Sequence, residues 1–344
     1  MTLTLTRRSF GLAATGALLA PYVHAAEPTP IRFVLDWKLQ GIHAWFYLAQ
    51  DRGYFARENL AVSIDQGSGS AATVTKVMAG AYDAGFGDVN AIVQAAAGRP
   101  GAAPVMVCML YNRAPFALIT KAAGPVKTLQ DLEGRTLGSP AGGAAARMFP
   151  VMAAQAGFDA AKVNWTNVAP NLQEQLMLQG HVDGAAVFSV TSYMNLAAQG
   201  VDPDKDIRWF HYADHGVDLY GNGVMVSPQL RKDKPQAVAG LVRAITQAVR
   251  DTVADPDAAI AALHQREPLL DAAIEKRRLL YTLKTVMRTP EVARIGLGDV
   301  DDARFARAAV QLQQAFELPR APAVGEIFDR SFLPPLAARQ LPAA

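Results

Sequence analysis

The stretch Ile31–Gln66, IRFVLDWKLQGIHAWFYLAQDRGYFARENLAVSIDQ, decides the fold class. Ile31–Trp37 is rich in β-branched and aromatic residues, which predicts a strand. From about Ile42 the pattern becomes helical and continues to Gly53, a residue type that commonly follows the last turn of a helix. Leu60–Gln66 predicts a second strand. A strand, a helix and another strand in this order indicate a parallel α/β sheet.

The alternation of strands and helices continues, and the chain then repeats itself. VMAGAYDAGFG (Val77–Gly87) aligns with MLQGHVDGAAV (Met177–Val187) at an offset of 100. In each segment a helix ends in Gly, two residues follow, and an Asp leads into a strand of small residues such as Ala84–Asp88. The following helices also match, since both close on Ala-Ala before a Gly. The repeat predicts two related α/β lobes.

The N-terminal residues have the pattern of an export signal. Arg7 and Arg8 precede the apolar run Phe10–Ala20, and small residues follow up to Ala25. A charged start, a short apolar run and an A-x-A-like site predict a secretory signal cleaved after Ala25, of the twin-arginine type. A buried N-terminal helix is the alternative. The run is too short to span a bilayer, so we expect an exported, periplasmic bacterial protein.

Charge and cysteine content exclude several classes of protein. Without Arg7 and Arg8 the 33 basic residues become 31, which equals the 31 acidic residues. No basic block remains that would suggest a nucleic acid or an anionic membrane as a partner. The single cysteine, Cys108, lies in the apolar run PVMVCMLY and is predicted to be a buried small hydrophobe. The sequence contains no HExxH, CxxC, Walker or GxSxG motif, so we expect neither a metal nor a cofactor.

Two glycine-rich loops are candidates for ligand contact, one in each predicted lobe. GSGS (Gly67–Ser70) and SPAGG (Ser139–Gly143) each precede a predicted helix, where free backbone N–H groups can meet a polar ligand. Ordinary helix capping is the alternative for either loop alone. Their pairing favours a ligand site, because ligands of open α/β sheets bind beyond the carboxyl ends of the strands.

The aromatic residues of the opening stretch divide into a candidate site and a predicted core. Trp37 lies where the first strand should end and can offer a flat apolar face, with Asp36 beside it as a hydrogen-bond acceptor. His43 opens the next helix and is a further candidate for the cleft. The remaining aromatic residues are predicted to be core: Trp45, Phe46, Tyr47, Tyr54 and Phe55.

These stretches together resemble a known family. LDW…HAWFYLAQDRGYFARENLAVSI, GSGSA…KVMAGAYDAGFGD and LEGRTLGSPAGG are similar to the NMT1/THI5-like and sulfonate/nitrate/taurine-type solute-binding proteins of ABC importers, over roughly 31–263. The resemblance implies a type II periplasmic-binding-protein fold, with two lobes that are mainly parallel sheets flanked by helices, joined by two crossover strands. On that plan 27–118 and 223–344, with the C-terminal helices, form one lobe, and 119–222 form the other.

The resemblance also implies the ligand site. One branch of the family binds aminopyrimidine precursors of thiamin and is similar to this chain at Asp36, Trp37 and His43, where the ring stacks on the tryptophan. This chain departs on the opposite wall, because 184–201 contains no Asp or Glu, only neutral residues such as Ser192 and Tyr193. An anionic or neutral aromatic ligand therefore remains open. The residues expected at the site are Asp36, Trp37, His43, Ser68, Gly69, Ser70, Asp88, Asn112, Gly142, Gly143, Phe188, Ser189 and Tyr220.

The function implied is that of a monomeric solute-binding component, which delivers a thiamin-precursor pyrimidine, a sulfonate or an aromatic acid to an ABC permease. A periplasmic ligand sensor on the same fold is one alternative. A pyrimidine synthase of the THI5 type is another, but those enzymes carry a cysteine-rich segment where this chain has HGVDLYGNG (His215–Gly223) without cysteine. We therefore expect a binding protein that is not an enzyme.

Overall fold

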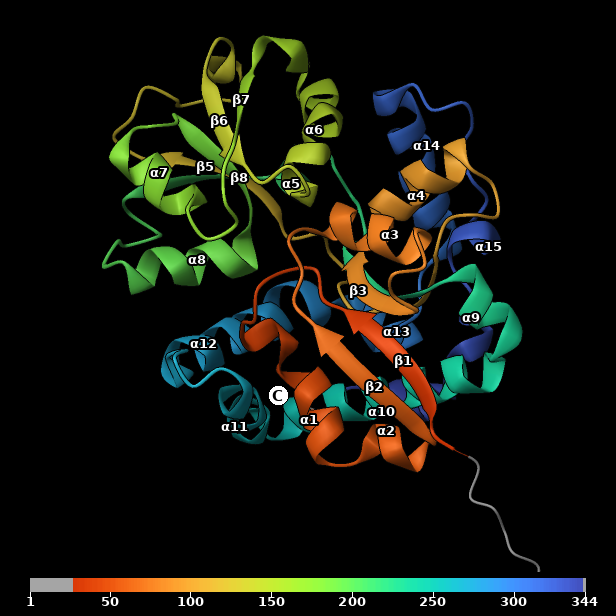
Figure 1. Ribbon diagram of the computed structural model, residues 1–344. Helices are drawn as coiled ribbons and strands as arrows, with labels where there is room; N and C mark the ends of the chain where they lie inside the picture. The colour runs from red at the N-terminus through yellow and green to blue at the C-terminus, as the bar shows by residue number, and fades with distance from the viewer. Residues whose placement is uncertain (1–26, 343–344) are drawn as a thin grey trace, which may run out of the picture.

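The computed structural model describes residues 27–342, and the predicted signal segment 1–25 lies outside them. The described residues form two five-stranded sheets, each flanked by helices, which give two lobes (Figure 1). This confirms the predicted two-lobed α/β fold. We call the unit built on the first sheet lobe 1 and the unit built on the second sheet lobe 2.

The first sheet has the strand order β2-β1-β3-β10-β4. β1 pairs in parallel with β2 and β3, whereas β10 is antiparallel to both β3 and β4. The sheet is therefore mixed, and its antiparallel strand is the one that returns from lobe 2. The strands of lobe 1 are β1 (Thr29–Val34), β2 (Leu60–Asp65), β3 (Ala84–Asp88), β4 (Val105–Met109) and β10 (Asn222–Val226).

The second sheet has the order β7-β6-β8-β5-β9. Here β6 pairs in parallel with β7 and β8, and β5 is antiparallel to β8 and β9. The strands of lobe 2 are β5 (Phe116–Lys121), β6 (Thr136–Ser139), β7 (Asn164–Asn167), β8 (Gly184–Phe188) and β9 (Ile207–His211). The expected boundary at 118–119 thus falls inside β5, because the chain enters the second sheet at Phe116.

The two sheets have the same topology. β3 and β8 hold the third position of their sheets, and their residues, Ala84–Asp88 and Gly184–Phe188, differ by the offset of 100 found in the sequence. β10 and β5 hold the fourth position, and each is the strand that has crossed from the other lobe. The internal repeat therefore corresponds to an architectural repeat.

The core of lobe 1 lies between the first sheet and a layer of helices. Trp45 and Phe46 of α1 are fully buried there, and both rings contact Phe86 of β3 edge to face. The predicted core role of these two residues is confirmed. The main helices of lobe 1 are α1 (Ala44–Asp51), α2 (Tyr54–Arg57), α3 (Ser70–Met78), α4 (Val89–Gly98), α9 (Pro228–Asp233), α10 (Pro235–Ala254), α11 (Pro256–Arg266), α12 (Ala272–Thr282), α13 (Pro290–Ile295), α14 (Asp302–Phe316), α15 (Val324–Ile327) and α16 (Leu336–Arg339).

The helices of lobe 2 meet those of lobe 1 along the interface between the lobes. α8 contacts α12, and α6 contacts α14 (Figure 1). The helices of lobe 2 are α5 (Ala144–Arg147), α6 (Phe149–Ala156), α7 (Gln173–Gln179) and α8 (Ser189–Ala198). Within 27–342 no helix is both long enough and apolar enough to cross a bilayer.

Two details of the opening stretch differ from expectation. The first strand ends at Val34, because the chain bends away and the backbone carbonyl of Asp36 accepts a hydrogen bond from Gly69 N–H at 2.7 Å. Tyr54 is only half-buried, whereas Phe55 is buried as predicted. Tyr54 stays at the surface because its hydroxyl bonds to the carboxylate of Asp251.

Two crossover segments, 110–115 and 212–221, connect the lobes, and they are bonded to each other. The N–H of Ala114 donates to the carbonyl of Leu219 at 3.0 Å, and the N–H of Gly221 donates to the carbonyl of Tyr111 at 2.9 Å. The connection is therefore a paired hinge rather than two independent linkers.

Candidate ligand-binding site

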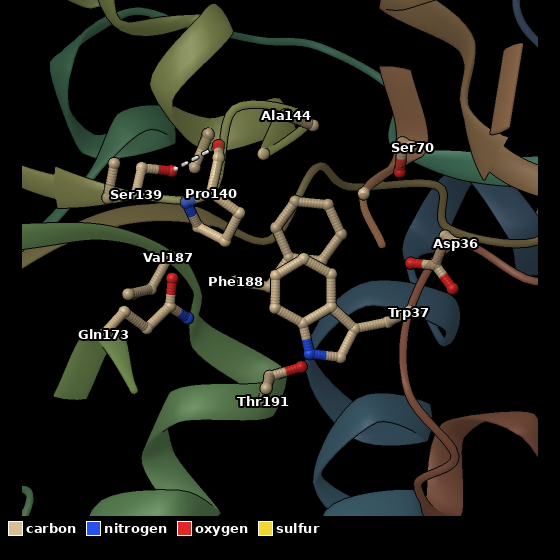
Figure 2. A pocket seen from close by; sticks show the side chains of 14 residues that line it. Asp36, Trp37, Ser70, Ser139, Pro140, Ala144, Gln173, Val187, Phe188 and Thr191 are labelled. Atoms are coloured by element: carbon tan, nitrogen blue, oxygen red, sulfur yellow. Dashed lines mark hydrogen bonds between the residues drawn. The ribbon is translucent and has the colours of Figure 1, made fainter. Parts of the chain in front are cut away.

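A cavity lies between the lobes at the carboxyl ends of the central strands (Figure 2). Lobe 1 contributes four of its lining residues and lobe 2 contributes the others. The lining residues are Asp36, Trp37, Gly69, Ser70, Ser139, Pro140, Gly143, Ala144, Ala145, Gln173, Ala186, Val187, Phe188 and Thr191. Six of the predicted site residues are among them: Asp36, Trp37, Gly69, Ser70, Gly143 and Phe188.

Trp37 is held in the bend that follows β1. Its backbone carbonyl accepts a hydrogen bond from Gly67 N–H at 3.0 Å, which fixes the segment against the glycine-rich loop. The side chain is half-buried and extends into the cavity (Figure 2). Trp45, eight residues later, is fully buried. Trp37 therefore has a face available to a ligand, and Trp45 does not.

Asp36, the neighbour of Trp37, is buried and is held by two polar side chains. His43 Nδ1 accepts a hydrogen bond from the N–H of Gln40 at 3.2 Å, so the proton of the neutral imidazole lies on Nε2. That Nε2 donates to Asp36 Oδ1 at 2.9 Å, and Asn222 Nδ2 donates to Asp36 Oδ2 at 2.7 Å. His43 is fully buried and is not among the lining residues. It orients the carboxylate rather than facing a ligand.

The two glycine-rich loops touch at the edge of the cavity. The N–H of Ala71 donates to the carbonyl of Gly142 across the lobes at 3.4 Å. Gly69 has φ +130°, and a Cβ added there would lie 2.2 Å from the Gly142 oxygen, so only glycine allows this approach. Ser68 and Gly142 belong to this contact and not to the lining.

Asp88 and Ser189 begin helices and lie outside the cavity lining. Asp88 caps α4, since its Oδ1 accepts from Asn90 N–H at 3.2 Å. Burial raises the pKa of Asp88 to about 7, although the hydrogen bonds from Asn90 oppose the shift. The N–H of Ser189 donates to the carbonyl of Pro115 at 2.8 Å. Both residues are expected site residues that the structure uses to anchor helices.

Asn112 and Tyr220 lie in the two crossover segments and away from the cavity lining. Asn112 Nδ2 donates to Glu291 Oε1 at 2.8 Å, and the Tyr220 hydroxyl donates to the same oxygen at 2.5 Å. The Arg304 guanidinium lies 4.0 Å from the centre of the Tyr220 ring. These two residues therefore join the hinge to the C-terminal helices.

The lining residues outside the expected set all belong to lobe 2: Ser139, Pro140, Ala144, Ala145, Gln173, Ala186, Val187 and Thr191. Ser139 and Pro140 lie in the glycine-rich loop Ser139–Gly143, which the sequence indicated as a candidate. The repeat could have indicated some of them. β6 holds the place in its sheet that β1 holds in lobe 1. Ser139, the last residue of β6, and Pro140 therefore lie at its carboxyl end, as Asp36 and Trp37 follow β1.

The wall formed by lobe 2 has a buried carboxylate behind it. Glu174 Oε1 accepts hydrogen bonds from Ser192 Oγ and from Asn195 Nδ2, the latter at 3.2 Å. Segment 184–201 itself is neutral, as the sequence shows, and the carboxylate comes from α7 instead. Glu174 is not among the lining residues, but its neighbour Gln173 is. Among the described residues, no cluster of His, Cys, Asp and Glu could hold a metal ion.

The family model described as "NMT1/THI5 like" matches residues 40–259. The chain belongs to this family. Its relatives include a riboflavin-binding protein of Chloroflexus aurantiacus, 25% identical over 84% of this chain and 82% of the relative, and a formylaminopyrimidine-binding protein of Halalkalibacterium halodurans, 25% identical over 68% and 69%. An enzyme is also among them: a 4-amino-5-hydroxymethyl-2-methylpyrimidine phosphate synthase of Legionella pneumophila is 21% identical over 75% of this chain and 80% of the relative.

Solved structures share the fold of this NMT1/THI5-like protein. The alkanesulfonate-binding protein of Xanthomonas axonopodis pv. citri, bound to MOPS, superposes with a TM-score of 0.67 at 18% identity. The match covers 89% of this chain and all of that one. At this identity the similarity establishes the two-lobed architecture and leaves the ligand open.

Proposed function

We propose that the protein is the solute-binding component of an ABC importer and clamps a small ring-containing organic solute between its lobes. The observation that carries the proposal is a cavity lined from both lobes, with the half-buried Trp37 projecting into it. A flat ring on Trp37 would contact lobe 2 at the same time and so favour the closed arrangement.

The proposal includes the setting in which this binding would occur. Residues 1–25 would direct export to the periplasm, and the mature chain would act as a monomer that presents its loaded, closed form to a membrane permease. Lobe 1 and lobe 2 would close about the paired crossover segments 110–115 and 212–221. Relatives named as binding proteins support this assignment.

Catalysis is not part of the proposal, for a chemical reason. Ser70, Ser139 and Thr191 place hydroxyl groups in the cavity, but the lining contains no histidine to act as a base for them. His43 already donates its Nε2 proton to Asp36. The segment His215–Gly223, where the resemblance to THI5-type synthases would imply cysteines, contains none.

A thermal-shift screen followed by solution scattering tests the proposal. Pyrimidines, alkanesulfonates, aromatic carboxylates and ring imides would be added to the signal-free protein. A ligand at 100 times its dissociation constant stabilises the folded state by about 2.7 kcal/mol. A compound that stabilises the protein should also decrease its radius of gyration. Stabilisation with an unchanged scattering profile would contradict the clamp.

A further inference from the structure

The charge of the cavity restricts the ligand. Of its lining residues none is Lys, Arg or His, and Asp36 is the only one with a formal charge. Each Asp36 oxygen already accepts a hydrogen bond from the protein, one from His43 and one from Asn222. An anionic group would enter a partly buried site without a cationic side chain, which is costly. This favours an uncharged ligand.

The shape and polarity of the cavity favour a flat ring. Trp37 lies on one side, and the Gln173 and Val187 side chains lie on the other (Figure 2). Much of the remaining lining is apolar: Pro140, Ala144, Ala145, Ala186 and Phe188. Aromatic and apolar walls with few polar groups are typical of sites in which the polar groups fix the orientation of the ligand.

Gln173 is the polar group best placed to fix that orientation. Its side chain is buried, with an exposed fraction of 2%, yet it lines the cavity. Its Nε2 donates to Glu174 Oε1 at 3.3 Å. Glu174 Oε1 also accepts from Asn195 Nδ2, and the orientation of Asn195 is fixed by Arg278, which donates to its Oδ1. The Glu174 oxygen is therefore an acceptor, and the NH₂ end of the Gln173 carboxamide faces it.

This contact leaves one hydrogen-bond acceptor and one hydrogen-bond donor of the Gln173 carboxamide without a partner. Gln173 Oε1 accepts no hydrogen bond from the described residues, and Nε2 has a second N–H beyond the one directed to Glu174. An acceptor and a donor therefore lie side by side at the cavity wall. The complement of this pair is a ring edge that carries an N–H next to a C=O, as in a lactam or an imide.

We propose that the solute is an uncharged planar heterocycle with a lactam or imide edge, which Gln173 recognises through its carboxamide while Trp37 stacks on the ring face. This inference rests on the proposed function and specifies its ligand class. It makes Gln173 a specificity-determining residue. A sulfonate would find no cation in the cavity lining. A neutral aminopyrimidine also carries a donor beside an acceptor, but its single ring would bury less area on Trp37 than a fused-ring imide.

Calorimetric titration with four probes tests the inference. 1-Methyl-lumichrome, called lumichrome below, has a single imide N–H at N3, and its N3-methyl derivative lacks that donor. Naphthalene-2-sulfonate supplies a flat anion, and 4-amino-5-hydroxymethyl-2-methylpyrimidine supplies an aminopyrimidine. We expect lumichrome to bind tightest and N3-methylation to weaken binding about tenfold, the scale of one or two lost hydrogen bonds.

The variant Gln173→Met supplies the second arm, with Gln155→Met at an exposed position of α6 as the matched control. Gln173→Met should weaken the binding of lumichrome about tenfold. It should leave the affinity for N3-methyl-lumichrome nearly unchanged, because this derivative already lacks the hydrogen bond to Gln173. Gln155→Met should change neither affinity. The comparison of the two lumichromes on the wild-type protein remains decisive if Gln173→Met does not fold.

The outcomes separate this inference from the proposed function. If the sulfonate or the aminopyrimidine binds tighter than lumichrome and decreases the radius of gyration, the imide assignment is overturned and the clamp stands. If Gln173→Met or N3-methylation leaves lumichrome affinity unchanged, the role of Gln173 is overturned. If none of the four probes binds, both the ligand class and the proposed capture of ring solutes are contradicted.

Discussion

The guanidinium of Arg278 donates a hydrogen bond to the backbone carbonyl of Thr191, which joins α12 of lobe 1 to α8 of lobe 2. Arg278 Nη2 also donates to Asn195 Oδ1 at 3.0 Å, and Glu275 pairs with the same guanidinium at 2.9 Å. Arg278 and Glu275 are both buried. Since Thr191 also lines the cavity, a single residue takes part in both the lobe contact and the candidate ligand contact.

Arg278→Met should weaken ligand binding about tenfold or more, because the closed arrangement loses charge-assisted hydrogen bonds between the lobes. It should also decrease stability by about 3–5 kcal/mol, since Glu275 is left buried without its partner. Arg277→Met, at the exposed neighbouring position, is the control. Titration calorimetry and denaturant unfolding measure the two effects.

The double variant Glu275→Gln/Arg278→Met distinguishes the effect of the ion pair on folding stability from its effect on lobe closure. Removing both charges should restore most of the stability while the ligand affinity stays low. Equal affinities in the double variant and the wild type would show that the ion pair has no role in closure.

Trp37→Ala should melt close to the wild type and bind its ligand at least about tenfold more weakly. The half-buried indole contributes little to the core, whereas stacking adds about 0.5–1.5 kcal/mol beyond the apolar area it buries against a ligand. Trp45→Ala should lose about 3–5 kcal/mol of stability, because this ring is fully buried. Melting curves and titrations on both variants check the assignment. A large loss of stability with unchanged ligand affinity in Trp37→Ala would show that Trp37 is a core residue.

Asp88 should make stability depend on pH in a definite direction. Burial raises its pKa to about 7 in the folded state, against about 3.9 in an unfolded chain. Between these values the folded state holds a proton that the unfolded state has lost, so stability falls as pH rises, by up to about 1.4 kcal/mol per pH unit.

Asp88→Asn removes this titration and can still accept the capping hydrogen bond from Asn90. We expect the variant to be more stable than the wild type at pH 7.5 and to differ little from it at pH 4. Urea unfolding at the two pH values measures the difference. An equal difference in stability between the variant and the wild type at both pH values would contradict a raised pKa of Asp88.

Cys108 should react slowly with a thiol reagent in the native protein and rapidly after unfolding. Its side chain is fully buried on β4, and burial raises the pKa of the thiol to about 12. Because Cys108 is not among the lining residues, saturating ligand should not change its labelling beyond a general stabilisation. Fast labelling of the folded protein would show that the strand is accessible.

The sequence predicted the architecture well because local pattern and sheet position agree. The spacing of Val77–Gly87 and Met177–Val187 corresponds to two strands in equivalent places. Trp37 and Asp36 could be placed at the cleft because a single strand end positions both. Such inferences need only one element and its periodicity.

Residues whose role depends on distant partners could not be placed in this way. The positions of Tyr220 and Asn112 in the sequence suggest the cleft. In the structure, however, both side chains donate hydrogen bonds to Glu291, which lies far along the chain. His43 is separated from the cavity by the carboxylate that it holds. Gln173 was missed because its significance depends on the fixed contact with Glu174, which no motif indicates.

The position of β10 also determines the order in which the molecule can form. Among the residues that the structure describes, β4 pairs in its sheet with β10 alone, and β10 begins only at Asn222, after every strand of lobe 2. A chain that emerges from the ribosome N-terminus first can therefore complete lobe 2 from a continuous segment, while β4 waits for its partner. The lobe whose synthesis starts first is the one whose sheet is completed last.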